Sequence, residues 1–472
     1  MKRVILAAAV AMCFAPAYAA NQTYTVDLVV VGAGAGGSVA ALSAVEGGLK
    51  TLLLEKNAFA GGAGNFMEGS FAAESFMQKE AGVKLTKIQA FNEMAAYHHW
   101  TINAPLVKAF VDESAETIQW VWDHGVHWKE VKTAWREKAD KTWHIYPSAG
   151  SLPKAMIEQF KAKGGQLLLQ TPAEKLIFKD GKVTGIQVTN KKDGTYTIHA
   201  KAVVDAAGGF GANNDLVSKY VPRLKGFATT NHPGATGDGL LLAEKAGAQL
   251  IDMTEIQTHP TVVPKVGEMI TEAVRGNGAI LINKDGKRFF NELNTRDAVS
   301  AAILKQKDGV AFLFFDSDMQ KSLKATNKYI KQSYCVSGAT IEEVAGKMGV
   351  PAAELQASID AWKKGKAAGK DAFGRADMPR NLDQAPFYAI MVTPAVHHTM
   401  GGIKIDSKTQ VYNAKGQVVP GLFAAGEITG GVHGGNRLGG NAQADIVTFG
   451  RIAGQQSYIY AMQAAAADKA KK

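Results

Sequence analysis

Five side chains between residues 259 and 296 carry groups that bind anions and move protons. They are His259, Thr271, Glu272, Arg275 and Arg296. Arginine presents a rigid fork of donors that matches a carboxylate, and histidine and glutamate are common acids and bases. Prolines and glycines interrupt the same stretch, which predicts turns between short strands. The stretch therefore favours a site that binds an anion and transfers a proton.

A glycine-rich turn near the N-terminus predicts a dinucleotide site. Thr25–Val31 has the pattern of a buried strand, and Gly32, Gly34 and Gly37 follow at the G-x-G-x-x-G spacing before an alanine-rich helix. A second short strand then ends at Glu55. In such a unit the glycines let backbone N–H groups approach a pyrophosphate, and the acid accepts from a ribose hydroxyl. A chance glycine turn is the alternative, and the complete unit argues against it.

Two later glycine-rich strand ends favour FAD over NAD as the dinucleotide. One ends at Gly208 and Gly209, and the other runs from Gly421 to Glu427. FAD oxidoreductases of this architecture return to the first sheet with such strands. We therefore expect an α/β fold whose Rossmann-like FAD-binding domain is discontinuous, with an inserted α+β capping domain. The expected boundaries are residues 21–250 and 372–472 for the FAD-binding domain and 251–371 for the capping domain.

The motifs resemble those of flavocytochrome c type fumarate reductases. The chain carries, in the family's order, HPT from His259, TEAVRG from Thr271, TRD from Thr295, HHTMGG from His397 and GGNRLGGN from Gly434. The likeness covers nearly all of the chain after about residue 201, and also residues 26–55. Between residues 60 and 151 it is poor, which leaves the identity of the substrate open.

The resemblance implies a reaction and a role for each polar side chain. A hydride from flavin N5 and a proton would add to the double bond of an α,β-unsaturated carboxylate. Fumarate is the first choice, and methacrylate, acrylate, urocanate or a cinnamate are alternatives. Arg296 is implied as the proton donor, resupplied through Glu272 and Arg275. The residues implied to hold the carboxylates are His259, Thr271, His397 and Arg437.

The same resemblance implies the cofactor contacts. FAD is expected to bind without a covalent link, because residues 60–70 contain no histidine that could carry it and Ser337–Thr340 lacks the acid of an FMN attachment motif. Backbone carbonyls near Thr399, Met400, Gly401, Glu427 and Thr429 could hold a sodium ion. The residues implied to line the FAD are Gly32, Gly34, Gly37, Glu55, Gly208, Gly209, Thr236, Gly237, Asp238, His398, Glu427 and Asn441.

Other interpretations of these residues stay open. Arg296 could form a structural ion pair with Asp297, and the two histidines at 397 and 398 could pack at a strand end. A flavin dehydrogenase or oxidase running in the opposite direction and a flavoprotein that only carries electrons are the competing functions. Five further histidines match no metal-ligand spacing and are interpreted as core or surface residues. They are His98, His99, His124, His127 and His144. His144, together with Tyr146, could instead reach a substrate pocket.

The N-terminus predicts export to the periplasm. Residues 1–20 combine Lys2 and Arg3, an apolar run and the small-residue cleavage site Ala17-Tyr18-Ala19. The run is shorter than the ~20 residues that span a bilayer. No other apolar run is as long, so we expect no membrane span in the mature chain. The net charge of +10 over 472 residues is mild and unclustered, so nucleic acid is not an expected partner.

Cysteine use predicts an external electron donor. Cys13 lies in the predicted signal, which leaves Cys335 alone and excludes an internal disulfide in the mature chain. No Cys-x-x-Cys-His sequence is present to attach a c-type haem. The resemblance implies that electrons come from a separate protein, expected to be a periplasmic c-type cytochrome.

Overall fold

Strand β1 (Tyr24–Val31) lies in the middle of the largest sheet of the computed structural model, which describes residues 24–133 and 140–470. The predicted signal peptide, residues 1–20, lies outside the described residues. The sheet has eight strands, and β1 pairs in parallel with β2 and β9. Its other strands are β2 (Thr51–Leu54), β6 (Gln166–Leu168), β7 (Ala173–Lys179), β8 (Lys182–Asn190), β9 (Gly194–Asp205), β17 (Gln410–Tyr412) and β18 (Val418–Ala424).

This sheet confirms the predicted return of the chain. Strand β9 ends at Asp205, just before Gly208. Its part from Ile198 to Asp205 pairs in parallel with β1 from one end of β1 to the other. Strand β18 pairs in parallel with β9 and ends just before Gly426. Because parallel strands end at the same edge of a sheet, three glycine-rich turns meet there.

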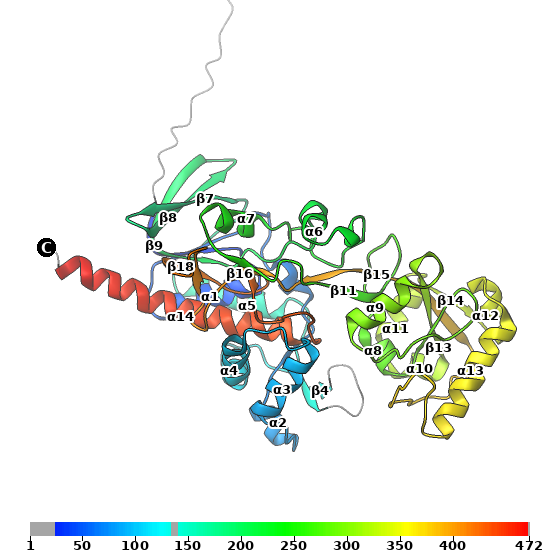
Figure 1. The fold of residues 1–472 in the computed structure, drawn as a ribbon. Helices are drawn as coiled ribbons and strands as arrows, with labels where there is room; N and C mark the ends of the chain where they lie inside the picture. The colour runs from blue at the N-terminus through cyan, green and yellow to red at the C-terminus, as the bar shows by residue number, and fades with distance from the viewer. Residues whose placement is uncertain (1–23, 134–139, 471–472) are drawn as a thin grey trace, which may run out of the picture.

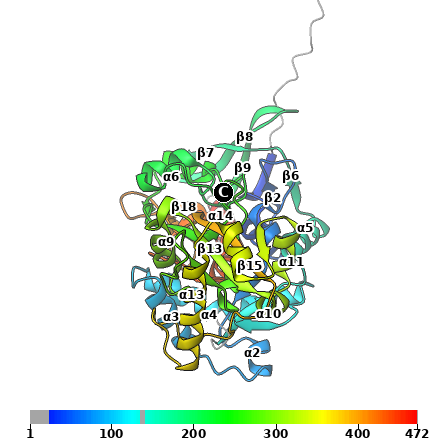
Figure 2. The same ribbon diagram turned by 90° about the vertical axis from the view of Figure 1, so that its right-hand side faces the viewer.

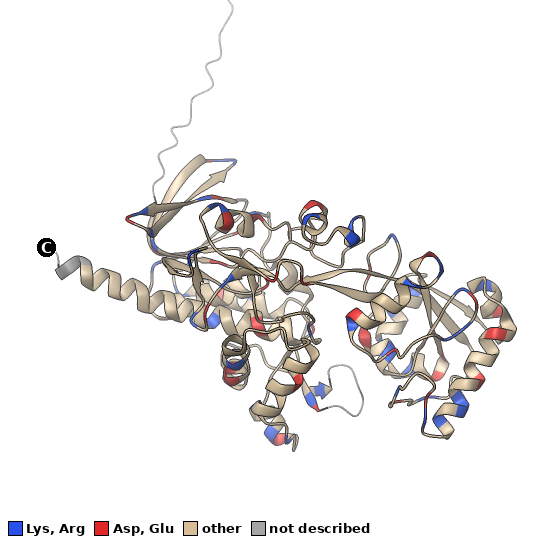
Figure 3. Cartoon of the chain, viewed as in Figure 1, with Lys and Arg blue, Asp and Glu red and all other residues tan. Residues whose placement is uncertain are grey.

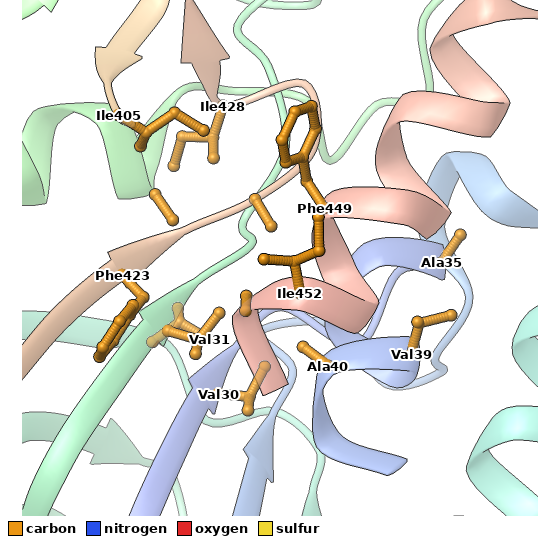
Figure 4. Packing of buried hydrophobic residues seen from close by; sticks show 14 of the residues in the cluster. Val30, Val31, Ala35, Val39, Ala40, Ile405, Phe423, Ile428, Phe449 and Ile452 are labelled. Carbon is orange, nitrogen blue, oxygen red and sulfur yellow. The ribbon is translucent and has the colours of Figure 1, made fainter. Parts of the chain in front are cut away.

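Two helices pack against the sheet around its buried aliphatic strand. Helix α1 (Ala35–Glu46) follows the glycine turn, and α14 (Asn441–Ala470) crosses it near the C-terminus. Figure 4 shows Val39 of α1 and Ile452 of α14 in the same apolar cluster as Val30. Val30 is fully buried, and burying such a side chain contributes roughly 1.5–3 kcal/mol. The packing of these apolar side chains therefore holds the glycine turn, which lies between β1 and α1, in place.

The segment between residues 250 and 400 builds a second body around two smaller apolar clusters (Figures 1 and 2). Its five-stranded sheet is centred on the long strand β15 (Phe387–Thr399), which pairs with three other strands along its length. Those partners and their neighbour are β11 (Ile256–Val262), β12 (Ile280–Ile282), β13 (Ala311–Asp316) and β14 (Cys335–Gly338).

Helices surround this second sheet, and β11 and β15 connect it to the first body (Figure 1). The sheet also includes β15, which lies after the expected end of the capping domain at residue 371. That domain boundary stays a prediction. Its helices are α8 (Glu272–Gly276), α9 (Arg296–Leu304), α10 (Ser317–Ser322), α11 (Ala325–Lys331), α12 (Ile341–Met348) and α13 (Ala352–Ala367).

Residues 69–162, which include most of the segment 60–151 that was expected to resemble the family least, form a small sheet and several helices. The sheet consists of β3 (Gly69–Phe71), β4 (Val131–Thr133) and β5 (Lys141–Ile145), with β5 in the middle. Two further short helices, α6 (Asn214–Tyr220) and α7 (Asp238–Lys245), and a three-stranded sheet of β10 (Leu250–Ile251), β16 (Gly402–Lys404) and β19 (Thr429–Gly430) complete the first body. The helices of this segment are α2 (Phe76–Glu80), α3 (Lys87–Tyr97), α4 (Ala104–Asp123) and α5 (Ser151–Ala162).

One local prediction was wrong. The stretch from residue 259 to 297 is not only turns and short strands, because α8 begins at Glu272 and α9 begins at Arg296. Each helix follows a threonine in extended geometry, Thr271 and Thr295. Of the glycines and prolines that suggested turns, Gly278 and Gly286 lie between the two helices, Gly276 ends α8, and the others lie before α8.

The surface carries both signs of charge on both bodies (Figure 3). Within residues 24–133 and 140–470, no helix is long and apolar enough to cross a membrane.

Candidate active site

One cavity of about 1180 Å³ connects the glycine turn to the polar residues of the second body. Its walls include Gly32, Gly34 and Glu55 at one end and Arg296 and Arg437 at the other. Residues separated by hundreds of positions therefore meet in one space. The other predicted site residues that line it are Gly208, Gly209, Asp238, His259, Thr271, Glu272, His397, His398 and Glu427.

The glycine turn has the geometry of a dinucleotide cradle. At Gly32, φ is +93°, and an added Cβ would lie 2.6 Å from the carbonyl oxygen of Ala206. At Gly37, an added Cβ would lie 1.8 Å from the carbonyl oxygen of Gly32. Gly34 is the N-cap of α1 and has no side chain to occupy the helix N-terminus, where a phosphate is favoured. These residues fit the pyrophosphate of FAD.

Glu55 and the second glycine turn complete this end of the cavity. The Glu55 carboxylate accepts from the backbone N–H of Ala33 at 3.1 Å and of Asn57 at 2.9 Å. A carboxylate accepts about four hydrogen bonds, so Glu55 keeps capacity for a ribose hydroxyl. At Gly208, φ is +86° and an added Cβ would meet nothing within 4 Å, so the backbone there borders open space.

Four residues implied to contact FAD are not in the cavity wall. Gly37 packs inside α1, and Gly237 is the left-handed N-cap of α7. Thr236 accepts from Lys56 Nζ at 2.5 Å, and the same amine contacts Asp238 Oδ2 at 2.5 Å. Asn441 begins α14, and its buried Nδ2 has no partner among the described residues. A direct role for these four in binding FAD stays a prediction.

Arg296 is held by Glu272 through two parallel hydrogen bonds. The Nε–H and Nη2–H groups of Arg296 donate to the Glu272 carboxylate oxygens at 2.8 and 2.7 Å. Arg275 Nη2 donates to the same carboxylate at 3.3 Å. The three side chains thus form a buried row with the carboxylate between the two guanidinium groups.

The alternative ion pair between Arg296 and Asp297 is not formed. The carboxylate of Asp297 accepts instead from Asn436 Nδ2 at 2.8 Å and lies 2.9 Å from His99 Nε2. The first turn of α9 therefore points its two charged residues to different partners.

Gln257 links the two arginines and was not predicted from the sequence. Its Oε1 accepts from Arg296 Nη1 at 2.8 Å and from Arg437 Nη2 at 3.1 Å. Its Nε2 donates to Asn436 Oδ1 at 2.5 Å and to the backbone oxygen of Arg437 at 2.8 Å. Gln257 lies two residues before His259 on β11, and this spacing is the one sequence signal that could have found it.

Burial and neighbouring charges shift the pKa values of this cluster. Burial alone raises the pKa of Glu272, but Arg296 and Arg275 overcome that effect and hold it well below the ordinary value. Burial and the neighbouring Arg296 lower the pKa of Arg437 to about 9. The pKa of Arg296 is raised, because Glu272 outweighs the effect of burial. At neutral pH the cluster therefore holds charged arginines and an ionised Glu272.

Three histidines of the cavity are neutral. Burial, together with nearby arginines, lowers the pKa values of His259, His397 and His398 well below the ordinary value. His259 Nδ1 accepts from the backbone N–H of Thr261 at 3.3 Å, so its proton lies on Nε2, which has no partner in the described chain. His259 therefore offers one N–H donor, and the His397 ring lies 5.2 Å from it.

The five other histidines divide between core and surface. His98 is fully buried and lies 5.8 Å from the His433 ring, which contacts Asp445 at 3.0 Å. His144 is buried against Ser75 at 2.7 Å. His124 and His127 pack on tryptophans of α4, and His99 is exposed. Among the described residues, no three His, Cys, Asp or Glu side chains are arranged to hold a metal ion.

The loop implied to hold sodium lies beside Glu427. The backbone N–H of Thr399 donates to Glu427 Oε1 at 3.1 Å, and Thr429 Oγ1 donates to the carbonyl oxygen of Gly426 at 2.8 Å. An added Cβ at Gly401 would lie 2.1 Å from the carbonyl oxygen of Asp252. These contacts keep the loop close to the cavity, and its role in binding an ion stays a prediction.

Comparison with known proteins agrees with this geometry. The model of a family described as "FAD binding domain" matches residues 27–442. A fumarate reductase (cytochrome) of Shewanella frigidimarina is 42% identical over 92% of this chain and 77% of its own length. A urocanate reductase of Eggerthella lenta is 34% identical over 92% of this chain and 74% of its own length.

A solved structure gives the same result for the fold. The open conformation of a flavocytochrome c3 fumarate reductase matches with a TM-score of 0.80 and 38% identity, covering 94% of this chain and 80% of that one. The expected fold class and the expected use of FAD are confirmed. The chain belongs to the FAD-binding flavoproteins of the flavocytochrome c type fumarate reductase family and is an FAD-dependent oxidoreductase acting on CH–CH groups.

Proposed function

We propose that the protein is a periplasmic reductase of an α,β-unsaturated carboxylate, with fumarate as its substrate. The observation that carries the proposal is an excess of buried positive charge at one end of the cavity. Arg275, Arg296 and Arg437 are each at most 5% exposed, and Glu272 is the carboxylate that pairs with the first two. Arg437 has no carboxylate within 4 Å among the described residues.

Three cations and one anion leave two uncompensated positive charges. Buried charges are costly unless they are paired, so this cluster favours a ligand that brings two negative charges. Fumarate is a dianion of that charge, and its two carboxylates lie at opposite ends of a short planar molecule. A monocarboxylate such as acrylate would compensate only one of the charges.

The polar groups supply a clamp for these carboxylates. Arg437 offers a planar fork with an unpaired Nε–H, and His259 offers its Nε2–H. His397 and Thr271 line the same space. Holding both ends fixes the double bond and polarises it, which turns binding energy into rate acceleration. Reduced FAD, when bound, would supply the hydride for one carbon of that double bond.

Arg296 donates the proton to the neighbouring carbon in this proposal. Three of its five N–H groups contact Glu272 and Gln257, which leaves two for the substrate. Arginine is ordinarily always protonated, but a carbon that gains negative charge is basic enough to take its proton. Glu272 returns a proton to Arg296, and Arg275 on its other side supplies Glu272.

The electron donor is proposed to be a separate periplasmic c-type cytochrome. The sequence supports this proposal, because it contains no Cys-x-x-Cys-His motif to which a c-type haem could be attached. We also propose that residues 1–20 direct export and that the carbonyl oxygens of residues 399–401, 427 and 429 bind sodium. NADH-driven turnover by the isolated protein at full rate would contradict the proposal that a separate cytochrome is the electron donor.

A substrate panel tests the function. The purified mature protein, with reduced viologen as donor, is offered fumarate, acrylate, methacrylate, urocanate and cinnamate. We expect fumarate to give the highest kcat/KM. Preference for another acid would replace fumarate, and reoxidation of the reduced protein by oxygen but by none of the acids would identify an oxidase. FAD should leave the protein on acid precipitation, since no covalent link is proposed.

A further inference from the structure

Strand β5 and the residues just before β3 form one wall of the cavity. Trp143 of β5 lines the same cavity as Arg296 and Arg437. It lies between residues 60 and 151, the part of the sequence that was expected to resemble the family least. A side chain from this strand can therefore distinguish this protein's substrate from that of its relatives.

Two adjacent glycines place Trp143 beside the proton donor. An added Cβ at Gly439 would lie 3.1 Å from Glu272 Oε2 and 3.6 Å from Arg296 Nη2. An added Cβ at the next residue, Gly440, would lie 2.9 Å from Trp143 Cδ1. Gly439 therefore borders the proton donor and Gly440 borders the indole, so one short stretch of backbone contacts both. Trp143 thus lies at the substrate end of the long cavity.

The indole is also fixed in position. An added Cβ at Gly69 would lie 2.4 Å from Trp143 Nε1, so backbone presses on the ring from Gly69 as well as from Gly440. The N–H of Phe71 donates to the carbonyl oxygen of Gly440 at 3.4 Å, and the N–H of Gly69 donates to Gln443 Oε1 at 2.9 Å. These bonds tie β3 to the start of α14. A ring held in this way acts as a rigid boundary.

The chemistry of this wall differs from that of the clamp. Its cavity-lining side chains include Met67, Glu68 and Trp143, none of which is a cation. A carboxylate gains nothing from this wall, and Glu68 repels one. The wall therefore limits the length and width of the acid without binding its charge.

We propose that Trp143 is a specificity residue that restricts the substrate to short unsaturated acids and excludes acids with a ring on the β-carbon. The proposal rests on the proposed function, because it assumes that an unsaturated acid lies on the clamp. The indole occupies the space that a β-aryl group would need. Removing the indole opens that space, while the clamp and its charges stay in place.

The experiment compares the variants Trp143→Ala and Trp143→Leu with the wild-type holoenzyme. The measured quantity is kcat/KM for cinnamate divided by kcat/KM for fumarate, with reduced viologen as donor. Because one methylene in an apolar pocket changes such a ratio by about 10-fold or more, we expect both variants to raise it at least ~10-fold. Trp122→Phe, on α4 outside the cavity wall, should leave the ratio unchanged.

A second measurement does not depend on turnover. The saturated acids succinate and 3-phenylpropanoate are titrated into the oxidised holoenzyme by calorimetry. The variants should bind 3-phenylpropanoate at least ~10-fold more tightly than the wild type does, while the Kd of succinate changes little. The Leu variant keeps an apolar side chain against Gly69 and Gly440. It therefore allows both measurements even if the Ala variant does not fold.

Three results would overturn the proposal. Unchanged ratios in folded, FAD-containing variants would mean that Trp143 does not bound the substrate. Weaker binding of 3-phenylpropanoate would mean that the indole stacks on a ring rather than excluding it. An altered flavin spectrum with unchanged ratios would mean that it contacts only the cofactor. Failure of the wild type to reduce fumarate would instead contradict the proposed function.

Discussion

The two ends of the cavity differ in the kind of protein atoms that line them. The end near Gly32 consists of backbone and small residues, and its shape depends on the absence of side chains. The end near Arg296 consists of long charged side chains that hold one another in a buried network. The first end should therefore lose its function when side-chain volume is added, and the second end when a charge is removed.

The largest effect should follow from adding one methyl group to the glycine turn. Gly37→Ala would place Cβ 1.8 Å from the carbonyl oxygen of Gly32, so the turn must move. We expect loss of FAD and of much of the folded protein, measured by flavin content and Tm. Gly48→Ala is the matched control. Gly48 has a positive φ and Gly37 does not, but an added Cβ at Gly48 would meet nothing within 4 Å, so only about 1–2 kcal/mol of backbone strain is expected.

Removing the carboxylate from the charged end should be the next largest change. Glu272→Gln leaves Arg275 and Arg296 buried without their shared counter-ion. Breaking a buried pair in this way typically costs about 3–5 kcal/mol, and urea unfolding with FAD bound measures it. Glu268→Gln is the control, since Glu268 pairs with Lys328 near the surface. Equal stability of the two variants would contradict the proposed difference between the two ends.

Arg437→Gln should weaken substrate binding rather than the fold. The variant loses a charged contact to the carboxylate, worth about 1.5–3 kcal/mol, so KM should rise roughly 10- to 150-fold. FAD content should stay near that of the wild type. An unchanged KM for fumarate would remove Arg437 from the clamp.

The smallest effect concerns pH. His259, His397 and His398 have pKa values well below 6.5 when folded, because burial disfavours their charged forms. The unfolded chain therefore binds more protons below about pH 6.5, and stability falls as pH falls through that range. Each such histidine adds about 1.4 kcal/mol per pH unit to the slope of the unfolding free energy against pH. His397→Gln should reduce the slope of unfolding free energy between pH 5 and 6 by that amount, and an unchanged slope would contradict it.

The two ends also differ in how well the sequence predicts them. The glycine turn was predicted with its strands and helix, because the G-x-G-x-x-G spacing and the apolar runs are local. The return strands β9 and β18 followed from the same kind of pattern. Short-range patterns of this kind fix the conformation and the partner of each segment.

The charged end depends on contacts between distant segments. Gln257 meets Arg437 across 180 positions, and the N–H of Arg296 donates to Tyr97 OH across 199 positions at 3.4 Å. The family resemblance supplied the arginines but not these partners. Trp143 was missed for the same reason, since its place beside Gly440 arises from the pairing of β3 with β5 and not from any spacing in the chain.

Arg296→Gln tests the central claim that Arg296 is the proton donor. We expect FAD content and fumarate binding to stay near wild type while kcat and kcat/KM fall together, the pattern of a contact made only in the transition state. Arg296→Lys should restore part of the activity with a new pH dependence. Normal turnover by Arg296→Gln would contradict the claim and move the role to His397 or His259. Unfolding or loss of FAD would show instead that the bond to Glu272 is structural.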